Sequence, residues 1–421
     1  MTSSAQRLAV VGLGYVGLPL AVRAAQCGVP TIGLDIGAEV VAALNAGRSH
    51  VDDVDVRELG VALRCGFEAT TDEQRLDDVD VAVICVPTPL DGQQAPDLRS
   101  VMAATRSIAR HLRSGMLVVL ESTTYPGTTD GPVRAALEES GLIAGTDFAL
   151  AFSPERIDPG NRRFTLANTP KVVGGLTAGC TARAVEFYAQ LVDTVVPTVG
   201  TREAEMAKLL ENTYRHVNIA LVNEMAVFSH ELGVDLWAAI AAAGTKPFGF
   251  ESFFPGPGVG GHCIPIDPNY LSHRVRQLGY QFRFVELAQD ISSRMPAYVV
   301  ARVQGALNEH HKSVRGSKVL LLGLTYKADV SDDRETPSRA IVRALRRLGA
   351  DVVGHDPHLE RFSVDDADLQ LSMDLEADLR DCDVAILLQR HAAYDLDAIQ
   401  KLATLVFDTR GVISGPNVER L

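Results

Sequence analysis

The chain has 421 residues, a formal net charge of −13 and 46% hydrophobic residues. At roughly 150 residues per domain, this length predicts two or three domains in an ordinary globular protein. The acidic balance argues against a general nucleic-acid binder, and no apolar run reaches about 18 residues, so we expect no membrane span. An anionic ligand must therefore be met by a local cluster of positive groups.

Six cysteines are scattered along the chain without any C-x-x-C pair. This usage is typical of a reducing compartment rather than of a disulfide framework, so we expect a cytoplasmic protein. The apolar N-terminus could be mistaken for a signal peptide. Arg23 interrupts it, however, and its glycines have turn spacing.

The first half of the chain alternates buried strands with helices. Strands are predicted in "RLAVVGLGYVG", "VPTIGLDI", "VDVAVICVPTP" and "MLVVLESTTYPG", with helices at residues 16–27 and 100–113 among them. Apolar strands that alternate with helices indicate a doubly wound parallel sheet.

A glycine turn follows the first predicted strand. Gly12, Gly14 and Gly17 form G-x-G-x-x-G at the start of a helix, and Asp35 ends the next strand. In this context the three glycines predict a tight turn, a close approach to a pyrophosphate and close helix–strand packing. Asp35 would accept hydrogen bonds from a ribose diol and repel a 2′-phosphate, so NAD is favoured over NADP. The alternative is a tight turn without a ligand.

Residues 203–243 contain no proline and predict a long helix followed by a shorter one. A second helical stretch covers about 285–311, and we expect Pro296 to interrupt it. This middle segment is long enough to form a dimer interface, and an intramolecular bundle is the alternative.

From Lys318 the strand–helix alternation resumes, and its order repeats that of the first half. "KVLLLGLTYKADV", "ADVVGHDP", "DCDVAILLQRH" and "TLVFDTRG" are its predicted strands. The fold class predicted is therefore α/β, with two doubly wound Rossmann-like domains joined by a helical segment. The second turn, "GLTYKADVSDDRET", has Lys327 and Arg334 in place of two glycines. It suits a different anion, such as a nucleotide-sugar diphosphate, or simply carries solvated charges.

A cysteine lies in the glycine- and proline-rich loop "GPGVGGHCIPIDP". Cys263 could be a covalent nucleophile, a metal ligand with His262, or a small buried residue. Metal ligation is disfavoured because no other Cys/His pair has zinc spacing, and no metal site is expected. The glycines at 258, 260 and 261 favour a loop that admits a substrate.

Other candidate residues lie outside this loop. Lys208 and Asn212 are four residues apart on the long predicted helix and so share a face, where a cation and an amide could stabilise an oxyanion. Either carboxylate of "FSPERIDPGN", Glu155 or Asp158, could act as a base for water, although Asp158 also fits a simple Asp-Pro-Gly turn.

These motifs occur together in a known order. "GLGYVGLPL", "VPTP", "ESTTYPGTT", "SPERIDPGN", "KLLENTYRHVNIALVNE", "GVGGHCIPIDPNYL" and "TYKADVSDDRETPS" make the chain resemble the UDP-glucose/GDP-mannose dehydrogenases from about residue 8 to 410. The resemblance implies two successive NAD-dependent oxidations of a nucleotide sugar, from the C6 alcohol to the carboxylate. It also implies an NAD domain (1–200), a central dimerisation segment with the cysteine loop (201–312) and a UDP-sugar domain (313–421).

The resemblance assigns roles to individual residues. Cys263 would be the nucleophile that gives a thiohemiacetal and then a thioester, and Lys208 and Asn212 would stabilise the oxyanion. The complete catalytic set is Cys263, Lys208, Asn212, Asp267, Glu155 and Thr123. The predicted cofactor-binding residues are Gly12, Gly14, Tyr15, Val16, Gly17, Asp35, Pro87, Thr88, Ser122, Thr123 and Arg334. The predicted substrate-binding residues are Glu155, Arg156, Lys208, Asn212, Gly260, Lys327 and Arg410.

The sugar and the assembly are also inferred from the resemblance. "SPER-x-DPGN" is similar to members that act on UDP-N-acetylhexosamines, so we expect UDP-GlcNAc ahead of UDP-GalNAc, UDP-ManNAc and UDP-glucose. A homodimer or larger homo-oligomer is expected. Only Lys246 stands near the place of the arginine with which family members reach the partner subunit's substrate. A two-electron dehydrogenase and a silent NAD-binding protein are the alternative functions.

Overall fold

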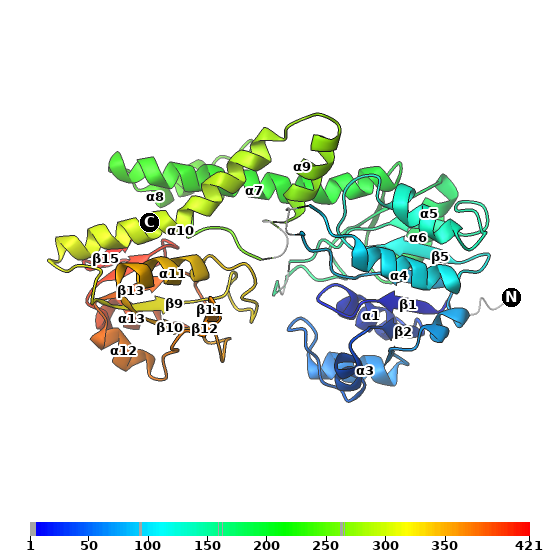
Figure 1. Cartoon of the computed structure of the whole chain (residues 1–421), viewed down its shortest axis with the longest axis horizontal. Coiled ribbons are helices and arrows are strands. Elements are labelled where there is room, and N and C mark those ends of the chain that lie inside the picture. Colours follow the sequence, from blue (N-terminus) through cyan, green and yellow to red (C-terminus); the bar gives the residue numbers. More distant parts are fainter. Residues whose placement is uncertain (1–5, 92–94, 159, 162, 262–263, 265) are drawn as a thin grey trace. The chain divides into compact units, whose positions relative to one another are not determined.

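The computed structural model describes residues 6–91, 95–158, 160–161, 163–261, 264 and 266–421. Within these residues the chain forms two compact units. The first comprises residues 1–211 with 269–280, and the second comprises 212–268 with 281–421. Figure 1 shows the elements of each unit. Cys263 and His262 lie outside the described residues.

The first unit is built on a sheet whose described strands lie in the order β3-β2-β1-β4-β5-β6-β7-β8. The pairings are parallel except between β6 and β7. These strands are β1 (Leu8–Val11), β2 (Thr31–Leu34), β3 (Glu68–Thr70), β4 (Val81–Ile84), β5 (Leu117–Leu120), β6 (Ala149–Phe152), β7 (Lys171–Gly175) and β8 (Val195–Pro197). The four strands predicted in this half are therefore confirmed as β1, β2, β4 and β5.

Helices cover both faces of this sheet. Its helices are α1 (Gly17–Gln26), α2 (Ala38–Asn45), α3 (Val56–Arg64), α4 (Arg99–Arg110), α5 (Arg134–Glu138) and α6 (Ala178–Tyr188). Along β1, Leu8 and Val10 pack in one buried cluster with α1, while Ala9 and Val11 pack in another with α4. Because successive strand side chains point to opposite faces, both faces must be apolar, as the uninterrupted hydrophobic runs predict.

The second unit repeats this plan with five strands in the order β10-β9-β13-β14-β15, all parallel. They are β9 (Lys318–Leu322), β10 (Asp351–His355), β13 (Val384–Leu387), β14 (Val406–Asp408) and β15 (Val418–Arg420). Val319 and Leu321 join one buried cluster, and Leu320 and Leu322 join the other. A short hairpin of β11 (Ser363–Val364) and β12 (Ala367–Asp368) packs beside α11 (Ser338–Leu348) in the first cluster, and α12 (Leu375–Asp381) and α13 (Leu396–Leu402) pack in the second.

The middle of the chain is helical, as predicted. It contains the long helix α7 (Thr201–Glu231), which Figure 1 shows as one uninterrupted rod, followed by α8 (Leu236–Ala243), α9 (Asp267–Gln277) and α10 (Arg283–Glu309). The prediction that Pro296 interrupts the last helix is wrong, since α10 continues through it. Met295, Val299 and Val303 are buried in the C-terminal core, and this packing offsets the one backbone hydrogen bond that Pro296 cannot donate.

No helix in the described part of the chain is long and apolar enough to cross a membrane.

Candidate active site

The turn after β1 has the geometry that a dinucleotide-binding turn requires. Gly12 has φ +93°, and a Cβ there would lie 2.8 Å from the carbonyl oxygen of Cys85. A Cβ on Gly17 would lie 1.9 Å from the Gly12 oxygen, so only glycine lets α1 start this close to β1. Gly14 is exposed and its Cβ position is open. The open position is the one at which a pyrophosphate approaches the backbone.

Asp35, directly after β2, completes this edge of the sheet. Its Oδ2 accepts the Leu13 N–H at 2.9 Å and its Oδ1 accepts the Gly37 N–H at 2.8 Å. A carboxylate has about four acceptor positions, so two remain for a ribose diol. Next to it, Ile36 is fully exposed and brings no charge that could meet a 2′-phosphate.

The remaining predicted cofactor residues of this unit follow β1, β4 and β5. Tyr15 and Val16 are half-buried in the glycine turn. The Ser122 hydroxyl donates to the Val86 carbonyl at 2.8 Å, and the Tyr270 hydroxyl donates to the Thr88 carbonyl. These contacts hold the segments after β4 and β5, including Pro87 and Thr123, at the carboxyl edge of the sheet, where such folds bind their ligands. The residues present fit NAD, which would supply the hydride acceptor.

A buried charge cluster lies behind this edge. Lys171, the first residue of β7, places its Nζ 3.1 Å from both Glu121 Oε1 and Glu155 Oε2. The Tyr188 hydroxyl donates to Glu121. Our sequence analysis missed Lys171, Glu121 and Tyr188. The available signal was a lysine at the head of the apolar run "KVVGG" and a glutamate at the end of "LVVLE".

The cluster fixes the charge of Glu155. Burial disfavours a charged ammonium, but the two carboxylates outweigh burial and raise the pKa of Lys171. Burial also disfavours the charged form of Glu121, and for a carboxyl group this raises the pKa. For Glu155 burial is outweighed by Lys171 and by the N–H groups of Arg156 and Ile157, at 2.6 and 2.7 Å, which lower its pKa. Glu155 is therefore a fixed anion and a weak proton acceptor.

Two further contacts shape the predicted substrate side of this unit. Arg156 pairs with Glu211 at 2.6 Å and donates to the Pro170 carbonyl at 2.6 Å. Glu205 of α7 accepts the N–H groups of Gly127 and Thr129 at 2.7 and 2.9 Å, which anchors the "ESTTYPGTT" segment. Glu205 is a further residue that sequence analysis did not single out.

Helix α7 carries Lys208 and Asn212, both buried, on one face. The Asn212 amide donates to Asp267 Oδ2 at 2.5 Å, and Asp267 is the first residue of α9. The structure thus brings together two predicted catalytic residues that are 55 positions apart in the sequence.

The glycines before Cys263 pack closely on a neighbouring turn. A Cβ on Gly260 would lie 2.7 Å from the Glu335 carbonyl oxygen, and a Cβ on Gly261 would lie 2.6 Å from the Tyr326 ring. The Gly261 N–H also donates to the Arg334 carbonyl at 3.1 Å. The space beside these glycines is filled by the turn after β9, so they permit close packing of the cysteine loop on that turn.

The C-terminal candidates lie in the same unit. Arg334 makes a bidentate pair with Asp332 at 2.6–2.8 Å. Arg410 donates from Nε to the Leu388 carbonyl at 2.7 Å, and its guanidinium approaches Gly256 at the start of the cysteine loop. Burial lowers the pKa of Arg410 to about 10, which leaves it charged at neutral pH. Lys246 is exposed and lies over the Phe248 ring at 4.9 Å.

The fold and the glycine turn together define an NAD-dependent dehydrogenase with a second, Rossmann-like domain. Family models support this class along nearly the whole chain. The NAD-binding domain of the UDP-glucose/GDP-mannose dehydrogenase family matches residues 6–192, its central domain matches 202–294, and its UDP-binding domain matches 320–415. The chain belongs to this family, so it is an NAD-dependent nucleotide-sugar 6-dehydrogenase.

Individual relatives agree with this assignment. UDP-N-acetyl-D-glucosamine 6-dehydrogenase of Pseudomonas aeruginosa is 38% identical over 83% of this chain and 82% of its own. UDP-N-acetyl-D-mannosamine dehydrogenase of Pyrococcus horikoshii is 36% identical over 84% of each chain. A solved UDP-D-ManNAc dehydrogenase from Pyrococcus horikoshii matches with a TM-score of 0.88 at 33% identity, covering 98% of both chains.

Proposed function

We propose that this enzyme oxidises the C6 alcohol of UDP-N-acetylglucosamine to the carboxylate in two NAD-dependent steps, with Cys263 as covalent nucleophile. The observation that carries the mechanism is the Asn212–Asp267 hydrogen bond at 2.5 Å. Cys263 is four residues before Asp267, so the chain confines its Cα to about 14 Å from that of Asp267. On this basis we assign Cys263, Lys208 and Asn212 to one catalytic group.

The chemistry balances with these groups. The first oxidation moves a hydride from C6 to NAD and the hydroxyl proton to a base, which leaves an aldehyde. The Cys263 thiolate adds to this aldehyde, and the new oxyanion meets the Lys208 cation and the Asn212 amide. A second hydride transfer gives the thioester. Water then attacks it and releases the acid and the thiol. The covalent bond keeps the aldehyde from leaving while the cofactor is exchanged.

Proton handling falls chiefly to Asp267 and Thr123. Asp267 is buried and accepts the Asn212 amide, and we assign this carboxylate to orienting the hydrolytic water. Thr123 follows β5 and can relay a proton through its hydroxyl. Glu155 acts in this proposal as a fixed negative charge, because two backbone N–H groups and Lys171 already occupy its oxygens.

The nucleotide half of the substrate is assigned to the second Rossmann-like domain. Lys327 and Arg410 supply positive charge there, and Gly260 lies in the loop that packs on the turn of Lys327. Arg156 is retained as a further substrate-binding residue. Arg334 is assigned to NAD. We retain the division into an NAD domain (1–200), a central dimerisation segment (201–312) and a UDP-sugar domain (313–421), and we propose a homodimer.

The choice of sugar is supported by "SPER-x-DPGN" and by the 38% identity to a UDP-N-acetyl-D-glucosamine 6-dehydrogenase. The mannosamine relative is 36% identical, so the acetamido group is better supported than the configuration at C2. Epimers differ in the position of one hydroxyl or acetamido group, which a few pocket contacts can discriminate.

The test is an NADH-production screen with UDP-GlcNAc, UDP-GalNAc, UDP-ManNAc, UDP-glucose and GDP-mannose. We expect UDP-GlcNAc to give the highest kcat/KM and two NADH per uronic acid. Cys263→Ser should lose acid formation by at least about a thousandfold, and Cys382→Ser, at a buried cysteine of the C-terminal core, is the matched control. One NADH per turnover, or a normal rate of acid formation in Cys263→Ser, would refute the covalent mechanism.

A further inference from the structure

The turn after β9 copies the dinucleotide turn after β1 in unusual detail. Gly323 has φ +80°, and a Cβ there would lie 2.5 Å from the Gln389 carbonyl oxygen, as one on Gly12 would meet Cys85. Asp356, directly after β10, accepts the Leu324 N–H on Oδ2 at 2.7 Å and the His358 N–H on Oδ1 at 2.9 Å. These are the contacts that Asp35 makes with Leu13 and Gly37. Asp356 therefore occupies the position of a ribose-binding carboxylate.

The two carboxylates differ in what else they bind. Asp356 Oδ2 also accepts the Thr325 N–H at 3.1 Å and the Nε2 of His391 at 3.1 Å, and the Asp356 side chain is fully buried. Three donors fill Oδ2 and one binds Oδ1, and the side chain is fully buried, so a ribose diol cannot reach this carboxylate. In the second domain the ring of His391 therefore binds the carboxylate that corresponds to Asp35. In the first domain Asp35 keeps acceptor positions for a ribose diol.

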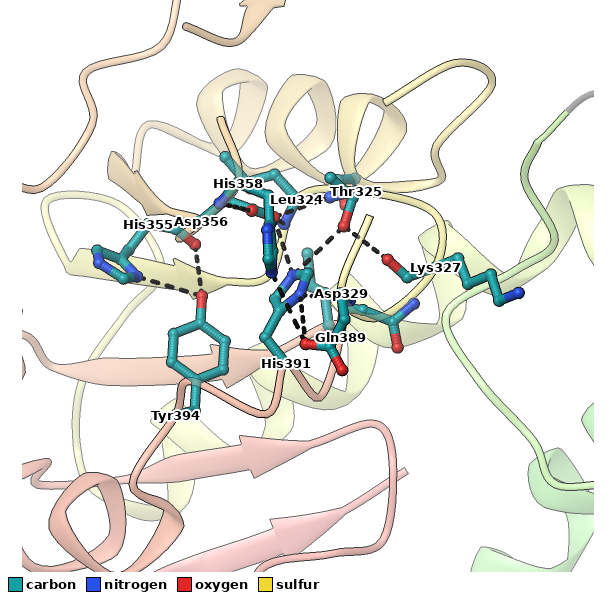
Figure 2. Close-up of polar contacts among 12 residues, drawn as sticks. Leu324, Thr325, Lys327, Asp329, His355, Asp356, His358, Gln389, His391 and Tyr394 are labelled. Atoms are coloured by element: carbon teal, nitrogen blue, oxygen red, sulfur yellow. Dashed lines mark hydrogen bonds and ion pairs between the residues drawn. The ribbon is translucent and has the colours of Figure 1, made fainter. Parts of the chain in front are cut away.

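The ring of His391 has a second contact that fixes its tautomer. The Asp329 N–H lies 3.0 Å from Nδ1, and a backbone N–H can only donate. Nδ1 is therefore the unprotonated nitrogen, and Nε2 donates its proton to Asp356 (Figure 2). The side chain of His391 is fully buried between these two aspartates.

This arrangement also excludes a metal site at His391. Asp329, His358 and His391 lie close enough to hold an ion, with ligand atoms within 4.8 Å of one another. The Nδ1 lone pair that would bind the metal is already taken by the Asp329 N–H. An N–H aimed at that lone pair would repel a cation, so we describe the group as a hydrogen-bonded support.

The support holds the segment that carries Lys327. Asp329 Oδ1 accepts the Ala392 N–H at 2.8 Å, and Gln389 donates to the Tyr326 carbonyl at 2.9 Å. Thr325 donates to the Lys327 carbonyl at 2.9 Å and lies 3.3 Å from His391 Nε2. Figure 2 shows the Lys327 side chain extending away from this network. Residues 325–329 are thus held by the segment after β13, and the Lys327 side chain is left outside this network.

We propose that His391 is a positioning residue for nucleotide-sugar binding, which acts by holding the 325–329 backbone through Asp329 and thereby places Lys327 against the diphosphate. Its bond to Asp356 orients the ring and closes the second turn to a ribose. This inference rests on the proposed placement of Lys327 at the nucleotide-sugar site.

Two substitutions of His391 test its two hydrogen bonds one at a time. The amide of His391→Asn reaches the position of Nδ1 and keeps an acceptor for the Asp329 N–H. The amide of His391→Gln reaches the position of Nε2 and keeps the donor to Asp356. We expect His391→Gln to raise the KM for the UDP-sugar roughly tenfold, the change typical of one lost buried hydrogen bond. The Asn variant should stay within about twofold of wild type. The KM for NAD and kcat should not change in either.

Calorimetric titration with UDP itself gives the second readout, because it needs neither turnover nor the correct hexosamine. His391→Gln should weaken UDP binding roughly tenfold even if the proposed sugar is wrong. His355→Gln is the matched control, since His355 contacts Tyr394 but not the 325–329 segment. The inference is overturned if Asn and Gln weaken UDP binding equally, if the KM for NAD rises in parallel, or if both variants fail to fold, because each result would assign His391 a purely structural role.

Discussion

At the scale of single residues, Glu205 shows how a helix can fix a ligand-binding segment through one side chain. Its carboxylate is fully buried and accepts the N–H groups of Gly127 and Thr129 and the Thr129 hydroxyl. Burial raises the pKa of Glu205 to about 7, although these three donors pull it in the opposite direction. A carboxyl group that titrates near neutral pH makes the stability of the protein pH-dependent.

The direction of this dependence follows from the two pKa values. The folded value, about 7, lies above the ordinary 4.5, so the folded state holds its proton longer than the unfolded state. Stability from this group is complete below about pH 4.5 and declines as the pH rises to about 7, by about 3 kcal/mol in total. We expect Glu205→Gln to remove this decline in chemical denaturation between pH 4.5 and 7.5. The exposed Glu203→Gln is the control. An unchanged slope in Glu205→Gln would contradict the prediction.

The buried charges mark the limit of residue-level prediction. The sequence predicted Glu155 from its motif, but its ionisation depends on Lys171, which lies 16 positions away on another strand. Lys171 in turn depends on Glu121, which follows β5. A charge at the end of an apolar run marks each of Lys171 and Glu121, but the order of strands in the sheet decides that they meet, and no local pattern shows this pairing.

At the scale of elements, the β1–α1 turn was predicted well because its chemistry is local. Gly17 is required by its contact with the Gly12 oxygen within the turn and Gly12 by its positive φ, while the close contacts from outside this turn come from the segment after β4. The close packing of Gly260 and Gly261 was not predicted, since the atoms that crowd them belong to Tyr326 and Glu335, about 65–75 residues further on. The continuity of α10 through Pro296 was also missed, because tertiary burial decided it.

The turn gives a paired prediction. Gly17→Ala adds a Cβ 1.9 Å from the backbone oxygen of Gly12 and should lower stability by about 1–3 kcal/mol. Gly14→Ala adds a Cβ in open space and should fold as wild type, but its methyl group should raise the KM for NAD by at least roughly tenfold. Thermal unfolding and NAD saturation kinetics measure the two effects. A Gly14→Ala enzyme with an unaltered KM for NAD would show that the turn does not receive the pyrophosphate.

At the scale of the whole molecule, the repeated order of strands and helices predicted two parallel sheets of the same topology. The structure extends the repeat to the positions of Gly12 and Gly323 and of Asp35 and Asp356, which the sequence echo alone was too weak to align. The two halves differ at Asp356, because His391 forms a hydrogen bond with this carboxylate. This divergence could not be predicted, because His391 comes from a segment after β13 that only the fold brings to Asp356.

The proposed dimer depends on an apolar stripe of α7. Tyr214, Leu221 and Phe228 are seven residues apart, so they share one face of the helix, and about half of each side chain is exposed. Tyr214 and Leu221 also line a groove of about 400 Å³ with Phe250 and Phe253. A stable interface buries about 800 Å² on each partner, and these large side chains would form its apolar centre if a second copy of the chain covers them.

Leu221→Glu tests this interface, because it places a charge at the centre of the stripe, where pairing would leave the carboxylate desolvated. Sedimentation should give at least twice the chain mass for the wild type and the single-chain mass for Leu221→Glu. Leu278→Glu, at another exposed leucine beyond the end of α9, should keep the wild-type mass. A wild-type enzyme that sediments as a single chain, or a Leu221→Glu variant that stays assembled, would remove α7 as the site of association.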